Sequence, residues 1–388
     1  MSPQMLDAHA KPPDNVRSLY KRYQRMRPEE LKTDPLILDF SKNIDTFDQQ
    51  EAAGLKIIGV IGRETLQDAF TNFDPKFSDG SQDTKVFEHA DMPGLHIIPS
   101  LLPPSIQSSL LNRMLHRDLS NPSHQTNIHL HYNVTYPEPP ASSFFSSKVG
   151  EASTNSEPTF IPKNPEVHKP LALTSVLAKK LRWVTFGGQY DWTAKVYPED
   201  AKALPPFPSD IGNLISDLFP DTLAEAAILN FYSPGDTLSV HRDVSETTDR
   251  GLVSLSFGCD GIFIIGPEPE TSEFDPRDGE RPIPNPSGCI ALRLRSGDAV
   301  YMAGKSRFAW HGVPQIIRGT CPGWLEQWPA TADSGDDNVH KSDGDVLLPD
   351  QMADDFGRWR GWMKNKRINL NVRQMQEESS KQNRYTTA

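Results

Sequence analysis

The sequence has few cysteines, a deficit of positive charge and no long apolar run. Its three cysteines, Cys259, Cys289 and Cys321, are widely spaced and form no C-x-x-C pair, which argues against a disulfide framework or a zinc ribbon. A formal net charge of -11 argues against non-specific coating of nucleic acid. The missing apolar stretches exclude a signal peptide and a membrane span. We therefore expect a soluble intracellular protein in a reducing compartment, nuclear or cytoplasmic, with the mitochondrion as an alternative.

Charge and proline are spread unevenly along the 388 residues. Residues 331–355 carry eight acidic side chains and one lysine, whereas residues 356–388 carry eight basic and two acidic ones. A local basic surface is therefore compatible with the negative total. Irregular composition over residues 121–170, 267–288 and 331–355 predicts insertions at the surface, and the first of these is expected to be a long loop or lid.

The pattern of apolar residues divides the chain near residue 91. Residues 1–90 are expected to form a partly helical N-terminal extension, with a basic helix over residues 15–32. A strand, a proline-marked turn and an amphipathic helix then open a main domain that should span residues 91–375. Short strand signals such as AILNFY, SLSF and INLNVR follow, separated by turn residues. This rhythm predicts an α+β fold with a jelly-roll core and flanking helices, and residues 376–388 should form a flexible polar tail.

A metal-binding pattern lies within the strand-rich region. In TLSVHRDVSE, His241 and Asp243 are separated by one residue, so on an extended strand both side chains point to the same face. His311, in RFAWHGVPQ, should follow a strand and precede a Gly-Val-Pro turn, where its side chain can project into the mouth of a barrel. Two histidines and one carboxylate on one face of Fe(II) leave positions open for a co-substrate and oxygen. We therefore expect these three residues to bind iron.

Three other patterns look like known sites but fail on context. A second HRD at residues 116–118 lies at the end of an amphipathic helix, where residues i and i+2 point apart, and neither copy continues as a kinase catalytic loop. The GKS sequence at residues 304–306 has alanine at position 299, where a P-loop requires glycine. His129 and His131 form another same-face pair, but no nearby carboxylate completes a ligand set. A solvated loop is the better interpretation of that pair.

The last strand signal, RINLNVRQ, alternates apolar and polar residues. Its polar residues share one face of the strand: Arg367, Asn369, Asn371 and Arg373. Taken alone, solvent is the default surrounding of such a face. An inward Arg367, however, has the planar fork that binds a carboxylate in a bidentate manner. Asn230 and Tyr232 share a strand face just before the histidine–aspartate pair and can add an amide and a phenol to the same carboxylate.

Together these motifs resemble the AlkB-like 2-oxoglutarate dioxygenases. The resemblance runs from about Pro93 to Gln374 and rests on N-F-Y-x-P-G-D-x-L-x-x-H-x-D, S-G-D, W-H and R-x-N-x-x-x-R. Within that family the sequence is most similar to the branch of AlkB homologue 1, through LRWVTFGGQYDWTAKVYP, LVSLSFG, IFIIG and SGDAVYMAG in order. The resemblance implies a double-stranded β-helix, Fe(II) as the metal, and 2-oxoglutarate and O2 as co-substrates.

The resemblance also implies roles for individual residues. His241, Asp243 and His311 would be the iron ligands. The other implied residues would contact 2-oxoglutarate or support the site: Asn230, Tyr232, Arg367, Asn369 and Arg373. Arg373 would reach either the co-substrate or Asp243. Tyr190, Trp192 and Tyr197 lie in the family's nucleotide-recognition segment, where they could stack on a flipped base or simply be core aromatics.

The reaction that the resemblance implies is oxidative demethylation, in which an N-methyl group leaves as formaldehyde while 2-oxoglutarate yields succinate and carbon dioxide. The expected substrate is a methylated adenine or related base in DNA or tRNA. A protein substrate such as a histone tail is an alternative, because an acidic chain suits a basic partner. A jelly-roll binding module without turnover is the third possibility, and the complete ligand set argues against it.

Overall fold

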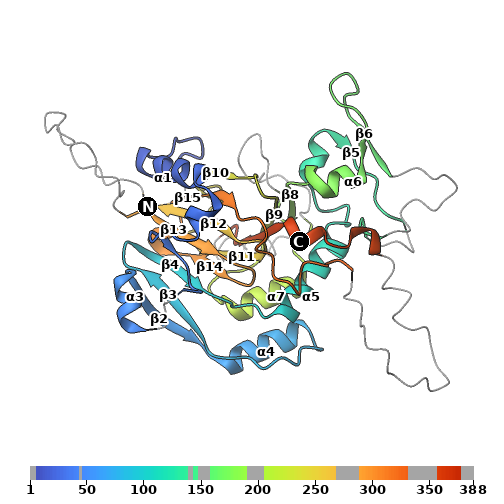
Figure 1. Cartoon of the computed structure of the whole chain (residues 1–388). Helices are drawn as coiled ribbons and strands as arrows, with labels where there is room; N and C mark the ends of the chain where they lie inside the picture. The colour runs from blue at the N-terminus through green and yellow to red at the C-terminus, as the bar shows by residue number, and fades with distance from the viewer. Residues whose placement is uncertain are drawn as a thin grey trace, which may run out of the picture.

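Two large β-sheets face each other across a central cavity in the computed structural model (Figure 1). The structure describes residues 6–42, 46–138, 143–146, 158–189, 205–267, 288–330 and 356–376. The fold is a mixture of helices and mainly antiparallel strands, as the sequence predicted. Most of the insertions expected at 267–288 and 331–355, and the tail expected beyond residue 376, lie outside the described residues.

The first sheet has five strands, of which only the short β1 pairs in parallel. In spatial order these strands are β1 (Ile37–Leu38), β13 (Ile290–Leu294), β12 (Gly261–Gly266), β15 (Trp310–Ile316) and β10 (Leu238–His241). The second sheet has eight antiparallel strands. They are β2 (Leu55–Ile61), β3 (Thr84–His89), β4 (Met92–Ile98), β14 (Ala299–Met302), β11 (Leu252–Gly258), β16 (Arg367–Arg373), β9 (Ala226–Tyr232) and β8 (Trp183–Gly187).

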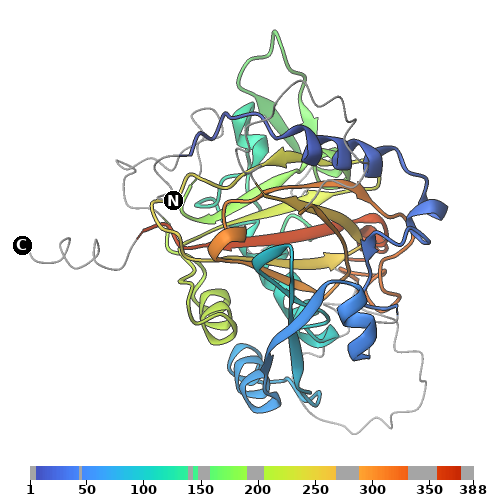
Figure 2. The same cartoon turned by 90° about the vertical axis from the view of Figure 1, so that its left-hand side faces the viewer.

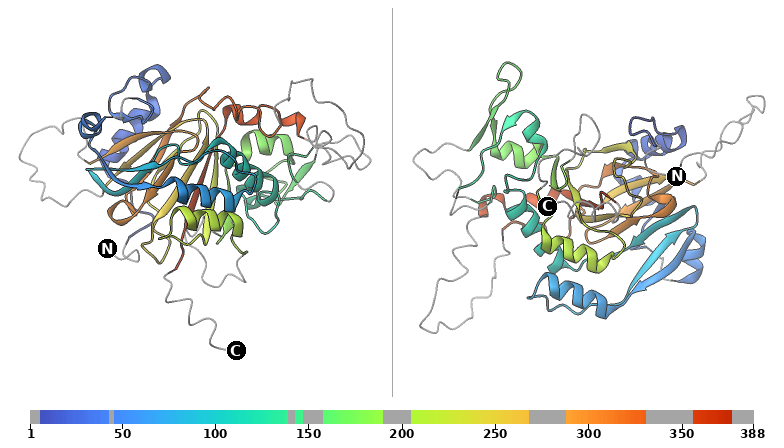
Figure 3. Two further views of the ribbon diagram at one scale, coloured as in Figure 1. Left: turned by 90° about the horizontal axis from the view of Figure 1, so that it is seen from below. Right: turned by 180° about the vertical axis from the view of Figure 1, so that it is seen from behind.

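Helices cover the outer faces of the two sheets (Figures 2 and 3). The α-helices are α1 (Asp14–Arg25), α2 (Pro28–Leu31), α3 (Phe47–Ala52), α4 (Arg63–Phe73), α5 (Pro104–Asn112), α6 (Leu173–Ser175) and α7 (Ser209–Leu218). Short π and 3-10 turns complete them: η2 (Arg113–Asp118), η3 (Asn127–Leu130), η4 (Val176–Lys180), η5 (Gly304–Ser306), η6 (Gly357–Trp359) and η7 (Trp362–Asn365). Among the described residues, no helix is long and apolar enough to cross a bilayer.

The N-terminal region packs against both sheets. The basic helix predicted over residues 15–32 is in fact two helices, because Pro28 cannot donate a backbone hydrogen bond and the chain restarts there as α2. Helix α1 places Val16, Tyr20 and Tyr23 against the outer face of the five-stranded sheet. Strands β2 and β3 extend the eight-stranded sheet beyond β4. The first ninety residues therefore contribute strands and packing to the same body as the rest of the chain.

A third, small sheet takes two of its three strands from residues 121–170, the range expected to be a long loop or lid. Its strands are β5 (Tyr132–Asn133), β6 (Thr159–Pro162) and β7 (Leu171–Ala172), and it projects to one side of the molecule (Figure 1). The expectation of a loop was wrong for these segments, because Ile128, Phe145 and Phe160 are buried in the main hydrophobic core. Burial of these widely spaced apolar side chains organises a segment that shows no hydrophobic period.

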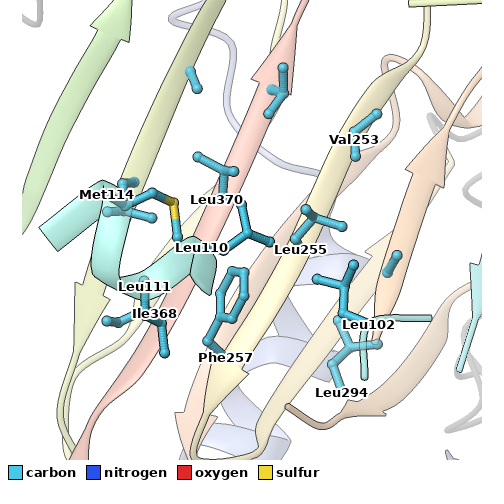
Figure 4. Close-up of a cluster of buried hydrophobic side chains, with 14 of the residues drawn as sticks. Leu102, Leu110, Leu111, Met114, Val253, Leu255, Phe257, Leu294, Ile368 and Leu370 are labelled. Atoms are coloured by element: carbon cyan, nitrogen blue, oxygen red, sulfur yellow. The ribbon is translucent and has the colours of Figure 1, made fainter. Parts of the chain in front are cut away.

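Strand β16 separates the core from the cavity by simple alternation. Its apolar side chains point outward to α5 and η2, where Ile368 and Leu370 meet Leu110 (Figure 4). Its polar side chains point the other way and line the cavity, as the sequence predicted: Arg367, Asn369, Asn371 and Arg373. One strand therefore supplies both the packing that fixes its position and the polar groups that face the cavity.

Truncation of Leu110 tests this packing. The side chain is fully buried between α5 and the eight-stranded sheet, so Leu110→Ala is expected to lower the free energy of unfolding by about 2–5 kcal/mol. Leu130→Ala is the matched control, because Leu130 is 52% exposed and its truncation should cost less than about 0.5 kcal/mol. Urea unfolding followed by circular dichroism measures both. Equal losses for the two variants would contradict the packing described here.

Candidate functional site

The cavity between the two sheets has a volume of about 260 Å³, near the lower end of small-molecule pockets. Both sheets line it. The five-stranded sheet contributes Leu238, His241, Phe263, Leu294, His311 and Val313. The eight-stranded sheet contributes Ile228, Asn230, Leu252, Ser254, Val300, Met302, Arg367, Asn369, Asn371 and Arg373. The cavity therefore combines a cluster of titratable groups with a largely apolar wall.

His241, Asp243 and His311 come together at one end of the cavity. Their candidate ligand atoms all lie within 4.8 Å of one another, and among the described residues this is the group of such side chains able to hold a metal ion. The two histidines are direct partners across β10 and β15, with ring centroids 4.5 Å apart. Asp243 follows the end of β10 and brings its Oδ2 to 3.5 Å from Nε2 of His311. The predicted cluster is therefore present.

Hydrogen bonds fix both imidazoles for binding through the same nitrogen. Nδ1 of His241 lies 2.9 Å from the carbonyl oxygen of Ser239, and Nδ1 of His311 lies 3.0 Å from that of Ala309. A carbonyl accepts only, so Nδ1 carries a proton in each ring, and Nε2 is the nitrogen left to face a metal. Burial, with a smaller effect from His311, lowers the pKa of His241 to about 4. Neutral imidazole is the form that binds a metal.

Asp243 stays ionised despite its burial. Burial raises the pKa of Asp243, but the combined effect of Arg373 and the two histidines is larger and lowers it. The resulting pKa lies well below the ordinary value. Nη1 of Arg373 is 3.3 Å from Oδ1 of Asp243. Two imidazoles and one carboxylate on one side of a cavity are the donor set that suits Fe(II) with open coordination positions. The described geometry therefore fits a divalent metal.

Arg367 lies at the other end of the cavity and is 2% exposed. Its Nη1 donates to the carbonyl oxygens of Cys259 and Leu294, and its Nη2 donates to Oγ of Ser256 at 2.8 Å. No carboxylate of the described residues forms a salt bridge with it, and its buried Nε has no hydrogen-bond partner there. A buried guanidinium without an anion is unfavourable, and burial lowers the pKa of Arg367.

Tyr232 and Gly261 lie next to Arg367, where a ligand of its guanidinium would bind. Tyr232 is its direct partner across β9 and β16, and the tyrosine hydroxyl is buried without a hydrogen-bond partner among the described residues. Burial raises the pKa of Tyr232, so the hydroxyl keeps its proton and can donate it in a hydrogen bond. A Cβ at Gly261 would lie 2.7 Å from Nε of Arg367. The arrangement therefore fits a small carboxylate.

Asn230 and Asn369 lie between the two ends of the cavity. They are direct partners across β9 and β16, and both line the cavity. Nδ2 of Asn369 donates to Oγ of Ser254 and to the carbonyl oxygen of Leu255. These hydrogen bonds to β11 fix the orientation of the Asn369 amide. The structure thus brings every described residue of the predicted site into one region, with Tyr232 beside Arg367.

The patterns that the sequence analysis set aside lie apart from this cavity where the structure describes them. His116 of the second HRD is stacked against Phe356 and Trp328, and burial lowers its pKa to about 4. His129 bonds to Thr126 and to the hydroxyl of Tyr136, outside any described metal-type group. The GKS sequence is the short turn η5 between β14 and β15. Tyr190, Trp192 and Tyr197 lie outside the described residues.

The surroundings of His311 differ from the expected strand end and turn. His311 lies inside β15, which continues through Gly312, Val313 and Pro314 to Ile316. The pairing of β12 with β15 shifts register between Ile262 and Ile264, opposite this stretch. Proline is tolerated in a sheet at such an irregularity because it has no N–H to donate. The expected turn was therefore wrong, although the side chain does reach the cavity.

Two buried residues next to Asp243 were not predicted from the sequence. Glu246 and Arg307 form a salt bridge of 3.0 Å, and Arg307 also donates to the main-chain oxygen of Asp243. The only available signal was proximity in sequence, since Glu246 is three residues beyond Asp243 and Arg307 is four before His311. Charged residues this close to ligands are ordinarily solvated, so the sequence did not distinguish them.

Comparison with known proteins places the chain in a family. The family model of the 2OG-Fe(II) oxygenase superfamily matches residues 94–373, and the chain belongs to that superfamily. Within it, the relatives show membership of the AlkB homologue 1 branch. The cofactor of this superfamily is Fe(II) with 2-oxoglutarate as co-substrate, in agreement with the metal-type cluster described above.

Three curated relatives illustrate the branch. N6-methyladenosine RNA demethylase ALKB1 of Pyricularia oryzae is 45% identical over 383 residues, which is 96% of this chain and 98% of the relative. N6-methyladenosine RNA demethylase ALKBH of Cryphonectria parasitica is 49% identical over 64% of this chain and all of its own length. tRNA demethylase abh1 of Schizosaccharomyces pombe is 35% identical over 75% of this chain and 82% of the relative.

Proposed function

We propose that this chain is an oxidative demethylase of N-methylated adenine in RNA, tRNA included, built on a double-stranded β-helix formed by the two facing sheets. The observation that carries the proposal is the presence, within one cavity, of the His241–Asp243–His311 cluster and of the buried Arg367, which forms no salt bridge among the described residues. The names of the relatives supply the substrate class. Each of these features supports one part of the reaction.

In the proposed site, His241, Asp243 and His311 hold Fe(II) through Nε2, carboxylate and Nε2. When bound, the iron supplies the redox chemistry that couples decarboxylation of 2-oxoglutarate by O2 to oxidation of the N-methyl group. Arg367 holds the distal carboxylate of 2-oxoglutarate and gains the anion that its buried guanidinium lacks. The protonated hydroxyl of Tyr232 donates to the same carboxylate, and Asn230 and Asn369 orient the co-substrate.

The apolar wall of the cavity performs the remaining task, which is exclusion of water. Leu252, Val300, Met302 and Val313 line the cavity. A dry site strengthens the electrostatic attraction between Arg367 and a carboxylate and protects reactive species from side reactions. The methylated base must leave its stack to reach the cavity, and Tyr190, Trp192 and Tyr197 are the residues that we propose to stack on it.

Product analysis tests the function directly. The protein is purified without oxygen, loaded with Fe(II) and 2-oxoglutarate, and given N6-methyladenine in single-stranded RNA, in a tRNA stem-loop and in DNA, beside a methylated histone peptide. Formaldehyde and succinate in equal amounts from the RNA substrates are the expected result. If formaldehyde were released from the peptide alone, the substrate would be a protein and not a nucleic acid. Neither product from any substrate would favour a binding module and overturn the proposal.

A further inference from the structure

A buried carboxylate that no sequence motif indicated, Glu246, lies between two arginines next to the metal-type cluster. Its side chain is fully buried, and those of Arg307 and Arg373 are 1% and 4% exposed. Oε2 of Glu246 accepts a hydrogen bond from Nη2 of Arg307 at 3.0 Å, and Oε1 accepts one from Nη1 of Arg373, also at 3.0 Å. Each oxygen of this carboxylate therefore serves a different arginine.

The same two arginines reach Asp243 from two sides. Nη1 of Arg373 is 3.3 Å from Oδ1 of Asp243, so one nitrogen is shared between the carboxylates of Asp243 and Glu246. Nη1 of Arg307 donates to the main-chain oxygen of Asp243 at 2.9 Å, while its Nε donates to the carbonyl of Arg250. Asp243 is thus contacted at its side chain by Arg373 and at its backbone by Arg307, and each of these arginines also contacts Glu246.

We propose that Glu246 is a positioning residue, which draws Arg373 away from Asp243 and so leaves that carboxylate available to a metal ion. The proposal rests on the function proposed above. A cation that is fully paired with a ligand carboxylate competes with the metal for it, whereas a shared cation competes less. Nη1 of Arg373 lies closer to the carboxylate of Glu246 than to that of Asp243, in agreement with this division.

Charge balance gives a second argument for the same role. Arg307 and Arg373 carry two positive charges, and Asp243 and Glu246 carry two negative ones, so the buried group is neutral before a metal binds. Removing the charge of Glu246 would leave one uncompensated cation beside a site that must accept a divalent ion. Such a buried excess charge is unfavourable, and Asp243 would be the carboxylate beside it.

Metal affinity measured without turnover tests the role of Glu246. In anaerobic titrations with Mn(II), Glu246→Gln is expected to weaken binding about 10–100-fold, the usual cost of losing a partner behind a metal ligand. Glu246→Asp keeps the charge but cannot span both arginines, so it should fall in between. The matched control is Glu88→Gln, which removes a buried carboxylate paired with Lys56 far from the cluster and should leave Mn(II) affinity unchanged.

A double-mutant cycle separates positioning from a general structural effect. If Glu246 acts through Arg373, Glu246→Gln should change Mn(II) affinity less than about three-fold when Arg373 is already glutamine. An equal effect in both backgrounds, or an unchanged affinity of Glu246→Gln, would overturn the proposal. If Glu246→Gln does not fold, an unchanged affinity of Glu246→Asp overturns it instead. Failure of the wild-type protein itself to bind Mn(II) would count against the proposed function rather than against Glu246.

Discussion

Alanine in place of His241 is expected to abolish metal binding and turnover together. His241 supplies one of three ligand atoms, and its Nε2 has no role in the described fold besides facing the cluster. Loss of a residue that only supports a ligand costs about 10–100-fold in metal affinity, so loss of a ligand itself should cost more than about 100-fold. Equilibrium dialysis with metal analysis measures the affinity, and succinate release measures the turnover.

His131→Ala is the control for this variant. His131 belongs to the other same-face histidine pair, is exposed, and packs against His168 with the ring centroids 4.6 Å apart, outside the cavity. Its loss should leave both readouts unchanged. Turnover retained by His241→Ala at the wild-type level would show that the His241–Asp243–His311 cluster is not the metal site of this protein.

Methionine in place of Arg367 is expected to weaken the binding of 2-oxoglutarate while leaving the stability of the fold nearly unchanged. The variant removes the cation that binds the distal carboxylate, and breaking a buried charged pair typically costs about 2–5 kcal/mol. The affinity for 2-oxoglutarate should therefore fall by at least about thirty-fold. Isothermal titration of the Mn(II)-loaded protein with 2-oxoglutarate measures it. Arg367→Lys should recover part of the affinity, because it keeps the charge but loses the planar fork.

The same substitution should not destabilise the ligand-free protein by more than about 1 kcal/mol. Arg367 is a buried cation without a carboxylate partner among the described residues, and replacing such a group by an apolar one is often neutral or stabilising. Denaturant unfolding without 2-oxoglutarate measures this. A large loss of stability together with unchanged affinity would mean that Arg367 is a structural residue and that another group binds the co-substrate.

Local spacing predicted the parts of the site that lie on single strands. The alternation in RINLNVRQ predicted that Arg367, Asn369 and Arg373 share a face, because a two-residue period does not depend on the rest of the fold. The one-residue spacing of His241 and Asp243 was informative as well, although Asp243 lies just beyond the end of β10 rather than on the strand. The third ligand, His311, required a distant partner to be chosen, and the order of the surrounding motifs made that choice possible.

Sequence could not predict the contacts that depend on packing between distant segments. The Glu246–Arg307 salt bridge joins residues 61 positions apart, and nothing in either local pattern marks a buried charge. The course of β15 through Pro314 depends on a register shift against β12, which is a property of the pair and not of either strand. The small sheet β5–β6–β7 is stabilised by aromatic side chains that are far apart in sequence and pack into the main hydrophobic core. The hydrophobicity of its sequence shows no periodic pattern from which the strands could be predicted.

The place of β10 at the edge of its sheet has a consequence for local opening of the backbone. This strand has four residues and, among the described strands, pairs with β15 alone, at Leu238 and His241 and with an irregularity between them. So short an edge strand belongs to the part of a fold that opens most easily. An ion bound to His241, Asp243 and His311 would fasten β10 to β15, because binding to the closed form alone favours that form. Amide hydrogen exchange along residues 238–241 would then report occupancy of the site, independently of any reaction.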